Sequence, residues 1–171
     1  MNDVREIVTR AVLAKGRKKF KLKETVLVDS DVSSVLGCWI INHQFKTELN
    51  GKEVVVEGTF ENNIWYSADD NSRTEVARST TEYRDVVKVK EVLNDNISDH
   101  CDVVARILQQ PTCTNAKITD CGIEVDVVFE VIVEVIGETK MVVTVFEPCD
   151  NFEPCDDFEN EINEDFLNET T

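Results

Sequence analysis

The chain has 171 residues, and its 34 acidic and 18 basic side chains give a formal net charge of −16 at pH 7. This balance argues against nucleic acid and against an anionic membrane surface as partners, because both require clustered cations. The start of the chain lacks the pattern of a targeting signal, and no stretch approaches the roughly 18 consecutive apolar residues that span a bilayer, so membrane insertion is not expected.

The first predicted element can be interpreted in two ways. Apolar residues from Val4 to Val12 fit one stripe of a helix, but they are rich in β-branched side chains, and the apolar run continues to Val26. The pattern favours a strand from about Val12 onward, with a helical turn before it as the alternative.

The body of the chain has the composition of β-strands. Short β-branched or aromatic runs alternate with turn signals that use Asn and Asp more than Gly. We expect strands at 54–60, 64–67, 74–77, 80–89, 101–108, 123–135 and 140–146. Turns or breaks are expected at 62–63, 68–72, 94–96 and 109–111, with a hairpin at Gly137-Glu138.

Eight to ten short strands with very little helix predict an all-β fold, an antiparallel β-sandwich formed by residues 1–146. Such a domain has sheet edges, and unprotected edges invite pairing with other copies. Residues 147–171 carry ten acidic side chains and no basic one. A segment of this composition cannot offset its ordering entropy, so we predict a disordered acidic C-terminal tail.

Charge is distributed unevenly between the two ends. Residues 1–23 hold eight basic side chains against two acidic ones, a local charge of +6. We therefore expect the basic start of one copy to meet the acidic end of another copy, or of its own chain. Salt should weaken that contact.

The tail contains a repeated hexad, Phe-Glu-Pro-Cys-Asp-Asn followed by Phe-Glu-Pro-Cys-Asp-Asp and a decayed third copy. Spaced aromatic residues in a disordered acidic segment favour multivalent docking of partners, and a solubilising tail is the alternative. The predicted docking residues are Phe146, Phe152, Phe158 and Phe166. Cys149 and Cys155 occupy the same place in each hexad and are candidates for intermolecular disulfides under oxidising conditions, although nearby carboxylates should slow them.

No catalytic constellation, cofactor motif or metal site emerges from the sequence. The six cysteines, which a cytosol would keep reduced, include no Cys-x-x-Cys pair. His100 and Cys101 are neighbours, but neighbours in a strand point to opposite faces, so we interpret them as a surface histidine beside a buried cysteine. His43 is interpreted as a strand-end residue. Asp69-Asp70-Asn71 lacks the Gly and distal Glu of a calcium loop and is interpreted as a turn.

Two further features have a functional and a plain interpretation. Trp39, Trp65 and Tyr66 would suit a sugar-stacking platform, but large aromatics flanked by Ile are more often core, which we favour. Gln109-Gln110 would suit an amide cross-linking enzyme and equally suits a turn.

Several blocks resemble the CotE family of spore outer-coat morphogenetic proteins, in order across nearly all of residues 5–146. They are Arg5–Lys18 (REIVTRAVLAKGRK), Leu36–His43 (LGCWIINH), Ile64–Ser67 (IWYS), Asp70–Val76 (DNSRTEV), Val104–Pro111 (VARILQQP) and Val135–Val143 (VIGETKMVV). An acidic tail follows, as in the family. The hexads depart from that pattern, and so does Cys38, which stands in place of a Gly.

This resemblance implies a structural scaffold and no enzyme. Family members act in the mother-cell cytoplasm during sporulation and then in the spore coat, form homo-oligomers, dock on inner coat morphogenetic proteins and recruit outer-coat proteins. The alternative is a monomeric binding module for a protein or glycan ligand, using Trp39, Trp65 or Tyr66.

Overall fold

The structure is a computed structural model and describes residues 3–93, 97 and 100–146. These residues contain seven β-strands and no helix: β1 (Asp3–Leu27), β2 (Val32–Asn50), β3 (Glu53–Ala68), β4 (Arg73–Lys88), β5 (Lys90–Glu91), β6 (Asp102–Thr119) and β7 (Gly122–Val145). The chain divides into two compact units, one formed by residues 8–139 and the other by the two ends, residues 1–7 and 140–171.

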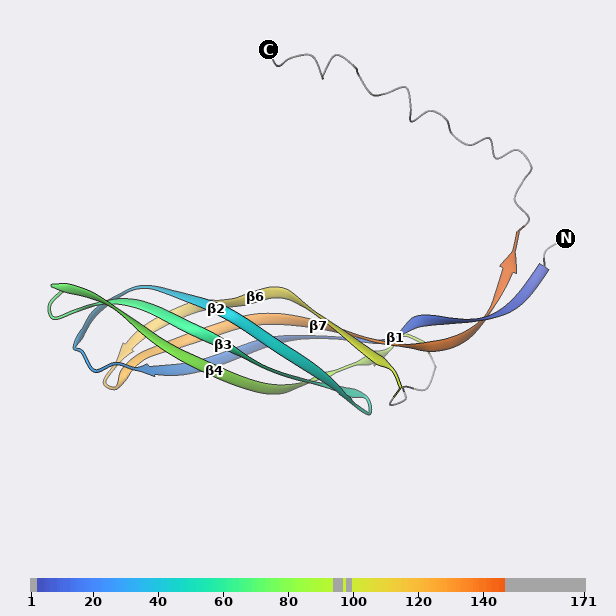
Figure 1. Cartoon of the computed structure of the whole chain (residues 1–171), viewed down its shortest axis with the longest axis horizontal. Coiled ribbons are helices and arrows are strands. Elements are labelled where there is room, and N and C mark those ends of the chain that lie inside the picture. Colours follow the sequence, from blue (N-terminus) through green and yellow to red (C-terminus); the bar gives the residue numbers. More distant parts are fainter. Residues whose placement is uncertain (1–2, 94–96, 98–99, 147–171) are drawn as a thin grey trace, which may run out of the picture. The chain divides into compact units, whose positions relative to one another are not determined.

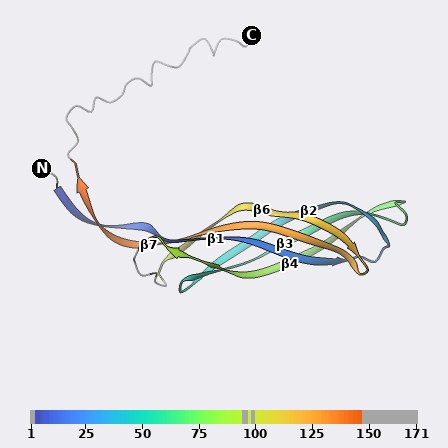
Figure 2. The same cartoon turned by 180° about the vertical axis from the view of Figure 1, so that it is seen from behind.

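Residues 8–139 form a sandwich of two antiparallel sheets. One sheet has the strand order β5-β1-β7-β6, and the other has the order β2-β3-β4. The three-stranded sheet lies in front in Figure 1 and behind in Figure 2. The predicted all-β sandwich is thus confirmed. The predicted disordered tail, and the break expected at 94–96, lie outside the described residues.

The strands are longer than predicted, which is why seven are found where eight to ten were expected. β3 passes through the predicted turn at Asn62-Asn63. Asn62 is fully buried, and its Nδ2 donates hydrogen bonds to Ser79 Oγ at 3.0 Å and to Thr81 Oγ1 at 2.9 Å. Hydroxyl groups on the neighbouring strand accept these bonds, so a residue typical of turns is held inside a strand, although its buried Oδ1 has no hydrogen-bond partner among the described residues.

β6 also continues past its predicted end. It crosses Gln109-Gln110-Pro111 by shifting register against β7, first between Ile107 and Gln109 and then between Gln109 and Thr112. Pro111 lies between these shifts and is paired with no residue of β7, so its missing N–H removes no bond from the ladder. The turn interpretation of the glutamine pair is therefore wrong.

The hairpin predicted at Gly137-Glu138 is wrong, because β7 is continuous from Gly122 to Val145. Gly137 instead leaves space for two side chains that pack closely against β7. A Cβ at this position would lie 2.6 Å from Leu13 Cδ1 and 2.8 Å from Cys101 Sγ. The hairpin before β7 turns at residues 120–121, where Thr119 pairs with Gly122.

The turn predicted at 68–72 is confirmed and joins β3 to β4, although Ala68 is still the last residue of β3. Asp69, Asp70 and Asn71 adopt φ angles of 51°, 54° and 63°. Asn and Asp tolerate this left-handed region better than most residues, which explains their concentration here.

The first segment is a strand, so the helical alternative is wrong. From Ala14 to Val26 the even-numbered residues of β1 are buried or half-buried, and the odd-numbered residues are exposed. This alternation gives β1 one face toward the core and one toward solvent.

The core lies between the two sheets. Every second residue of β7 from Ile123 to Val135 is fully buried, as the alternation of apolar and acidic residues predicts. An aromatic cluster fills the middle of the core. Phe20 stacks on Phe129 with ring centroids 4.6 Å apart, and Tyr83 lies 4.9 Å from Phe129.

The second unit contains the start of β1 and the end of β7 among its described residues, 3–7 and 140–146. Lys140 forms an ion pair with Glu6, and Arg5 Nε lies 2.8 Å from Asp3 Oδ2. The exposed large apolar residues in the described part of this unit are Val4, Ile7, Met141, Val142 and Phe146.

Candidate assembly surfaces

Only one of the predicted tail sites lies within the described residues. Phe146 follows the end of β7 and is 73% exposed, so its ring is accessible as docking requires. Phe152, Phe158, Phe166, Cys149 and Cys155 lie outside the described residues.

A basic stripe on β1 lies beside an acidic stripe on β7, on the outer face of the four-stranded sheet. The stripes comprise Lys15, Arg17, Lys19, Lys21 and Lys23 on β1, and Glu124, Asp126, Glu130 and Glu134 on β7. Arg17 donates from Nε and Nη2 to both carboxylate oxygens of Glu130, at 2.6 and 2.9 Å. Lys15 Nζ lies 3.1 Å from Glu134. As the residue numbers of the basic side chains rise along β1, those of their acidic partners on β7 fall. The ion pairs therefore follow the antiparallel arrangement of the two strands.

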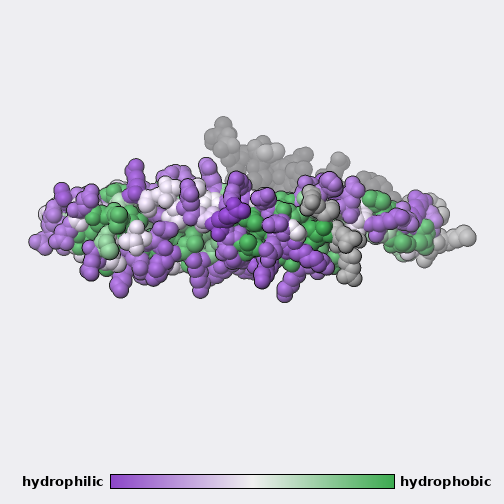
Figure 3. Space-filling view, turned by 90° about the horizontal axis from the view of Figure 1, so that it is seen from below, coloured by the Kyte–Doolittle hydropathy of each residue, from purple (hydrophilic) through white to green (hydrophobic). Residues whose placement is uncertain are grey.

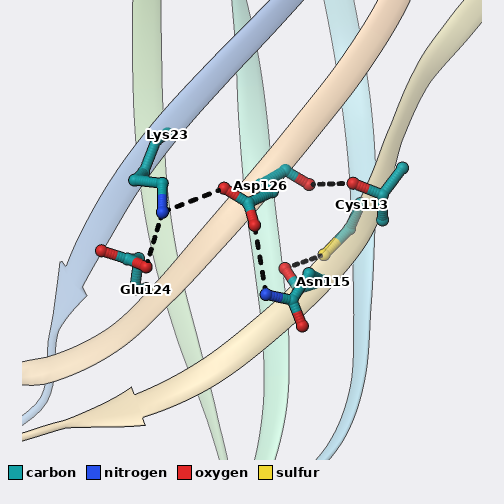
Figure 4. Close-up of polar contacts among 6 residues, drawn as sticks. Lys23, Cys113, Asn115, Glu124 and Asp126 are labelled. Atoms are coloured by element: carbon teal, nitrogen blue, oxygen red, sulfur yellow. Dashed lines mark hydrogen bonds and ion pairs between the residues drawn. The ribbon is translucent and has the colours of Figure 1, made fainter.

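The same face is tied across to β6, as Figure 4 shows. Lys23 Nζ lies 2.9 Å from Glu124 and 3.6 Å from Asp126. Asp126 also accepts a hydrogen bond from Asn115 Nδ2 at 3.1 Å, and the Asn115 carbonyl accepts one from the Cys113 thiol at 3.3 Å. Side-chain contacts therefore connect three neighbouring strands.

The carboxylates of this network lie beneath the longer basic side chains. Glu130 is 17% exposed, whereas Arg17 is 65% exposed. The hydrogen bond from Arg17 holds the pKa of Glu130 below its ordinary value. Six of the eight basic residues in 1–23 have acidic partners among the described residues: Arg5, Arg10, Lys15, Arg17, Lys18 and Lys23. Contact of this segment with 147–171 lies outside the described part of the chain.

The outer face of the three-stranded sheet carries two exposed tryptophans. Trp39 on β2 is 55% exposed and Trp65 on β3 is 45% exposed, and their rings meet edge to face with centroids 6.5 Å apart. The Trp39 ring lies over Gly37, where a Cβ would come within 2.6 Å of it. The core interpretation is therefore wrong for both tryptophans. It is confirmed for Tyr66, which is 4% exposed and donates to Glu75 at 2.6 Å.

β4 is an edge strand with a regular ladder along its whole length. Its pairing with β3 runs from Ala68–Arg73 to Glu53–Lys88 without a register shift. The edge strands β2 and β6, by contrast, each shift register at three places. Bulges bend an edge and disrupt its free hydrogen-bonding groups, so β4 is better suited than β2 or β6 to accept another strand.

Two half-buried side chains on β2 form interior contacts that the sequence pattern did not reveal. His43 is not at a strand end but in the middle of β2, where its Nε2 and the Tyr83 hydroxyl form a 2.7 Å hydrogen bond. Burial lowers the pKa of His43 and raises that of Tyr83 to about 12. Burial, together with a hydrogen bond to Cys113 on β6, raises the pKa of Cys38 to about 12.

Other chemical candidates remain dispersed. His100 is exposed in a turn, as interpreted from the sequence, whereas Cys101 beside it is half-buried and not buried. Within the part of the chain that the structure describes, no three His, Cys, Asp or Glu side chains gather where they could hold a metal ion. No helix among those residues is long and apolar enough to cross a membrane.

Comparison with known proteins supports the resemblance drawn from the sequence blocks. The model of the family described as outer spore coat protein E (CotE) matches residues 3–170, nearly the whole chain. Searches of curated proteins and of solved structures each return no match. The family is one of structural proteins of the spore coat, which implies a coat role and location here. The chain belongs to the outer spore coat protein E (CotE) family.

Proposed function

We propose that this protein is a morphogenetic scaffold of the endospore coat, which self-associates around the forespore and recruits outer-coat proteins. It acts first in the mother-cell cytoplasm, where it docks on inner coat morphogenetic proteins. Residues 1–146 form the assembly domain, and residues 147–171 form the recruiting tail.

The observation that carries the proposal is the open, unbulged edge of β4, which contrasts with the register shifts of the edge strands β2 and β6. Natural domains usually blunt such an edge, because its unpaired N–H and C=O groups template pairing with other chains. In a protein of the spore coat, retention of an open edge supports pairing between copies as part of the function.

Self-association is tested by light scattering on the purified protein in reductant, full length and as residues 1–146. Large oligomers from both are expected, because the β4 edge lies in the body. Monomers from both, over the accessible range of concentration, would contradict the scaffold and favour an adaptor.

Recruitment is proposed to use the spaced aromatics of the tail. Many weak sites on neighbouring copies bind a multivalent client strongly through effective concentration. Replacing Phe146, Phe152 and Phe158 by Ala together should weaken the capture of outer-coat proteins by roughly tenfold or more. Leu167→Ala in the same acidic segment is the control. Unchanged capture by the triple variant would remove the docking role.

A second candidate function rests on the exposed Trp39–Trp65 pair. Edge-to-face tryptophans on an open sheet face suit a binding module that stacks a glycan or a protein side chain. Quenching of tryptophan fluorescence by a soluble glycan, lost in Trp39→Ala, would favour this module. A monomeric protein in the scattering experiment would favour it further.

A further inference from the structure

The backbone of β4 presents free hydrogen-bonding groups on every second residue. The N–H of Val86 donates to its neighbour Asp85 Oδ1 at 2.7 Å, and the carbonyl of Val86 accepts from Lys18 Nζ at 2.9 Å. These contacts place Val86 on the open side of β4. The directions of backbone N–H and C=O groups alternate along a strand. The backbone groups of the even-numbered residues from Thr74 to Arg84 therefore also face the open side of β4.

Among the described residues, side chains bind the outward-facing backbone groups of β4 only near the end of the strand. Asp85 and Lys18, which are 2.7 Å apart, occupy the N–H and C=O of Val86. No backbone partner covers the open side from Val76 to Arg84 among the described residues. This stretch borders the side of the sandwich seen in Figure 3, where mostly hydrophilic side chains surround smaller apolar areas.

Two charged residues on this stretch have no partner within the described part of the chain. Arg84 is paired with Glu57 at 3.0 Å, and Arg73 with Asp69 at 2.8 Å. Arg78 and Glu82, by contrast, are exposed and take part in no ion pair or hydrogen bond there. They lie four residues apart on one strand, about 13 Å, which is too far for them to pair with each other.

Arg78 and Glu82 are placed symmetrically about Thr80. In an antiparallel pair of identical strands centred on Thr80, Arg78 of each copy lies opposite Glu82 of the other. Opposite charges at such cross-strand positions stabilise the pairing, and like charges oppose it. The two-fold arrangement therefore forms two Arg78–Glu82 pairs between the copies, and every one of these charges gains a partner.

We propose that two copies of this protein pair through their β4 strands, antiparallel, with a two-fold axis at Thr80. The proposal rests on the self-association in the proposed function and names its interface. The pairing would join two three-stranded sheets into one continuous six-stranded sheet. It is isologous, since each copy contributes the same surface.

The charges also select the register. Centring the pair on Arg78 would place Arg78 opposite itself, and centring it on Glu82 would place Glu82 opposite itself. A centre at Thr81 would place Arg78 opposite Arg84. A centre at Ser79 would leave both charges opposite neutral or apolar residues.

The Thr80 register also brings Glu75 opposite Asp85 of the second copy, at the end of the ladder. Each carboxylate already has its own cation, since Arg73 lies 3.1 Å from Glu75 and Lys18 lies 2.7 Å from Asp85. These end contacts therefore add little repulsion.

Charge reversal tests the interface by light scattering on the full-length protein. Arg78→Glu and Glu82→Arg each place like charges opposite one another twice, so each should weaken association about tenfold or more. The double variant Arg78→Glu/Glu82→Arg exchanges the two charges and should restore association. Circular dichroism on each variant establishes that the fold is kept.

The outcomes separate this interface from the scaffold function. Wild-type association in both single variants would overturn the β4 interface while leaving the scaffold in place. Failure of the double variant to recover would overturn the Thr80 register. A monomeric wild-type protein would overturn the interface and the self-associating scaffold together.

Cross-linking provides a measurement that does not depend on charge. In the proposed register the two Thr80 Cα atoms lie about 5.5 Å apart, within the range that a disulfide spans. Thr80→Cys should therefore form a covalent dimer under mild oxidation by a small disulfide such as oxidised glutathione. Thr74→Cys, on the same face but away from the axis, is the matched control. Equal dimer yields from Thr80→Cys, Thr74→Cys and the wild-type protein would overturn the proposal.

Discussion

Gly58 is a tight point in the sandwich, where the packing leaves no room for a side chain. A Cβ at this position would lie 2.3 Å from the Gln44 carbonyl oxygen and 2.7 Å from the Tyr83 hydroxyl. The Gln44 oxygen belongs to the β2 backbone, so it cannot move aside as a flexible side chain would. The missing side chain lets Tyr83 reach His43 between the sheets.

Gly58→Ala is expected to lower the free energy of unfolding by about 3 kcal/mol, because the added methyl group overpacks a rigid backbone contact. Chemical denaturation of the variant and the wild-type protein measures this loss. Gly51→Ala is the comparison, since its turn has open space but a φ of 61°. It should cost about 1 kcal/mol. An equal or larger loss at Gly51 would contradict the packing argument.

The sequence could predict the conformation of single residues better than their surroundings. The left-handed turn at 69–72 was predictable, because Asp and Asn favour that backbone conformation. The exposure of Trp39 and Trp65 was not, because it depends on which face of the sheet lies against the core. Hydrophobicity alone places both tryptophans inside, whereas β3 buries Ile64 and Tyr66 on the opposite face.

At the scale of elements, the contact between β1 and β7 combines a buried apolar face with an outer layer of ion pairs. Glu130 has a lowered pKa because Arg17 donates hydrogen bonds to it. A carboxyl group whose pKa is lowered on folding contributes stability above its ordinary pKa. That contribution is lost as the pH falls through the folded value.

The wild-type protein should therefore lose stability as the pH falls below about 4.5, the ordinary pKa of Glu. Glu130→Gln should be less stable at pH 7 and should show a weaker dependence on pH in this acid range. Its effect at pH 7 should be smaller than that of Gly58→Ala, because the Arg17 side of the pair is largely exposed to solvent. Thermal unfolding between pH 3 and pH 7 measures both effects, with Glu138→Gln as control. An unchanged pH profile in Glu130→Gln would contradict the role of this pair.

The periodicity of β7 predicted which residues face the core, but it could not identify the strand that supplies the counter-charges. The residues at which strands begin and end were also harder to predict than the residues that face the core. Gly137 looked like a turn residue, although it is a site where Leu13 and Cys101 approach the backbone. Asn62 looked like a strand break, although Ser79 and Thr81 accept hydrogen bonds from its Nδ2 across the sheet. Each of these outcomes depends on partners distant in sequence.

At the scale of the whole molecule, assembly depends on topology. The sequence indicated that a strand-rich domain would have edges, but it could not show that β4 is one of them or that its ladder is unbulged. In the sequence alone, Arg78 and Glu82 are ordinary surface charges. The strand order shows that they lie on an open edge. The repeats of the tail are evident in the sequence, but the tail lies outside the described residues. Its docking role is therefore a proposal.

The most direct test of edge-mediated assembly is amide hydrogen exchange over residues 74–84, on dilute dissociated protein and on the assembled form. In a single copy, the even-numbered amides of this stretch point away from β3 and should exchange rapidly. Assembly through β4 should slow their exchange, and the fully internal strand β3 should change little. Unchanged exchange over 74–84, with new protection on β2 or β6, would contradict the account.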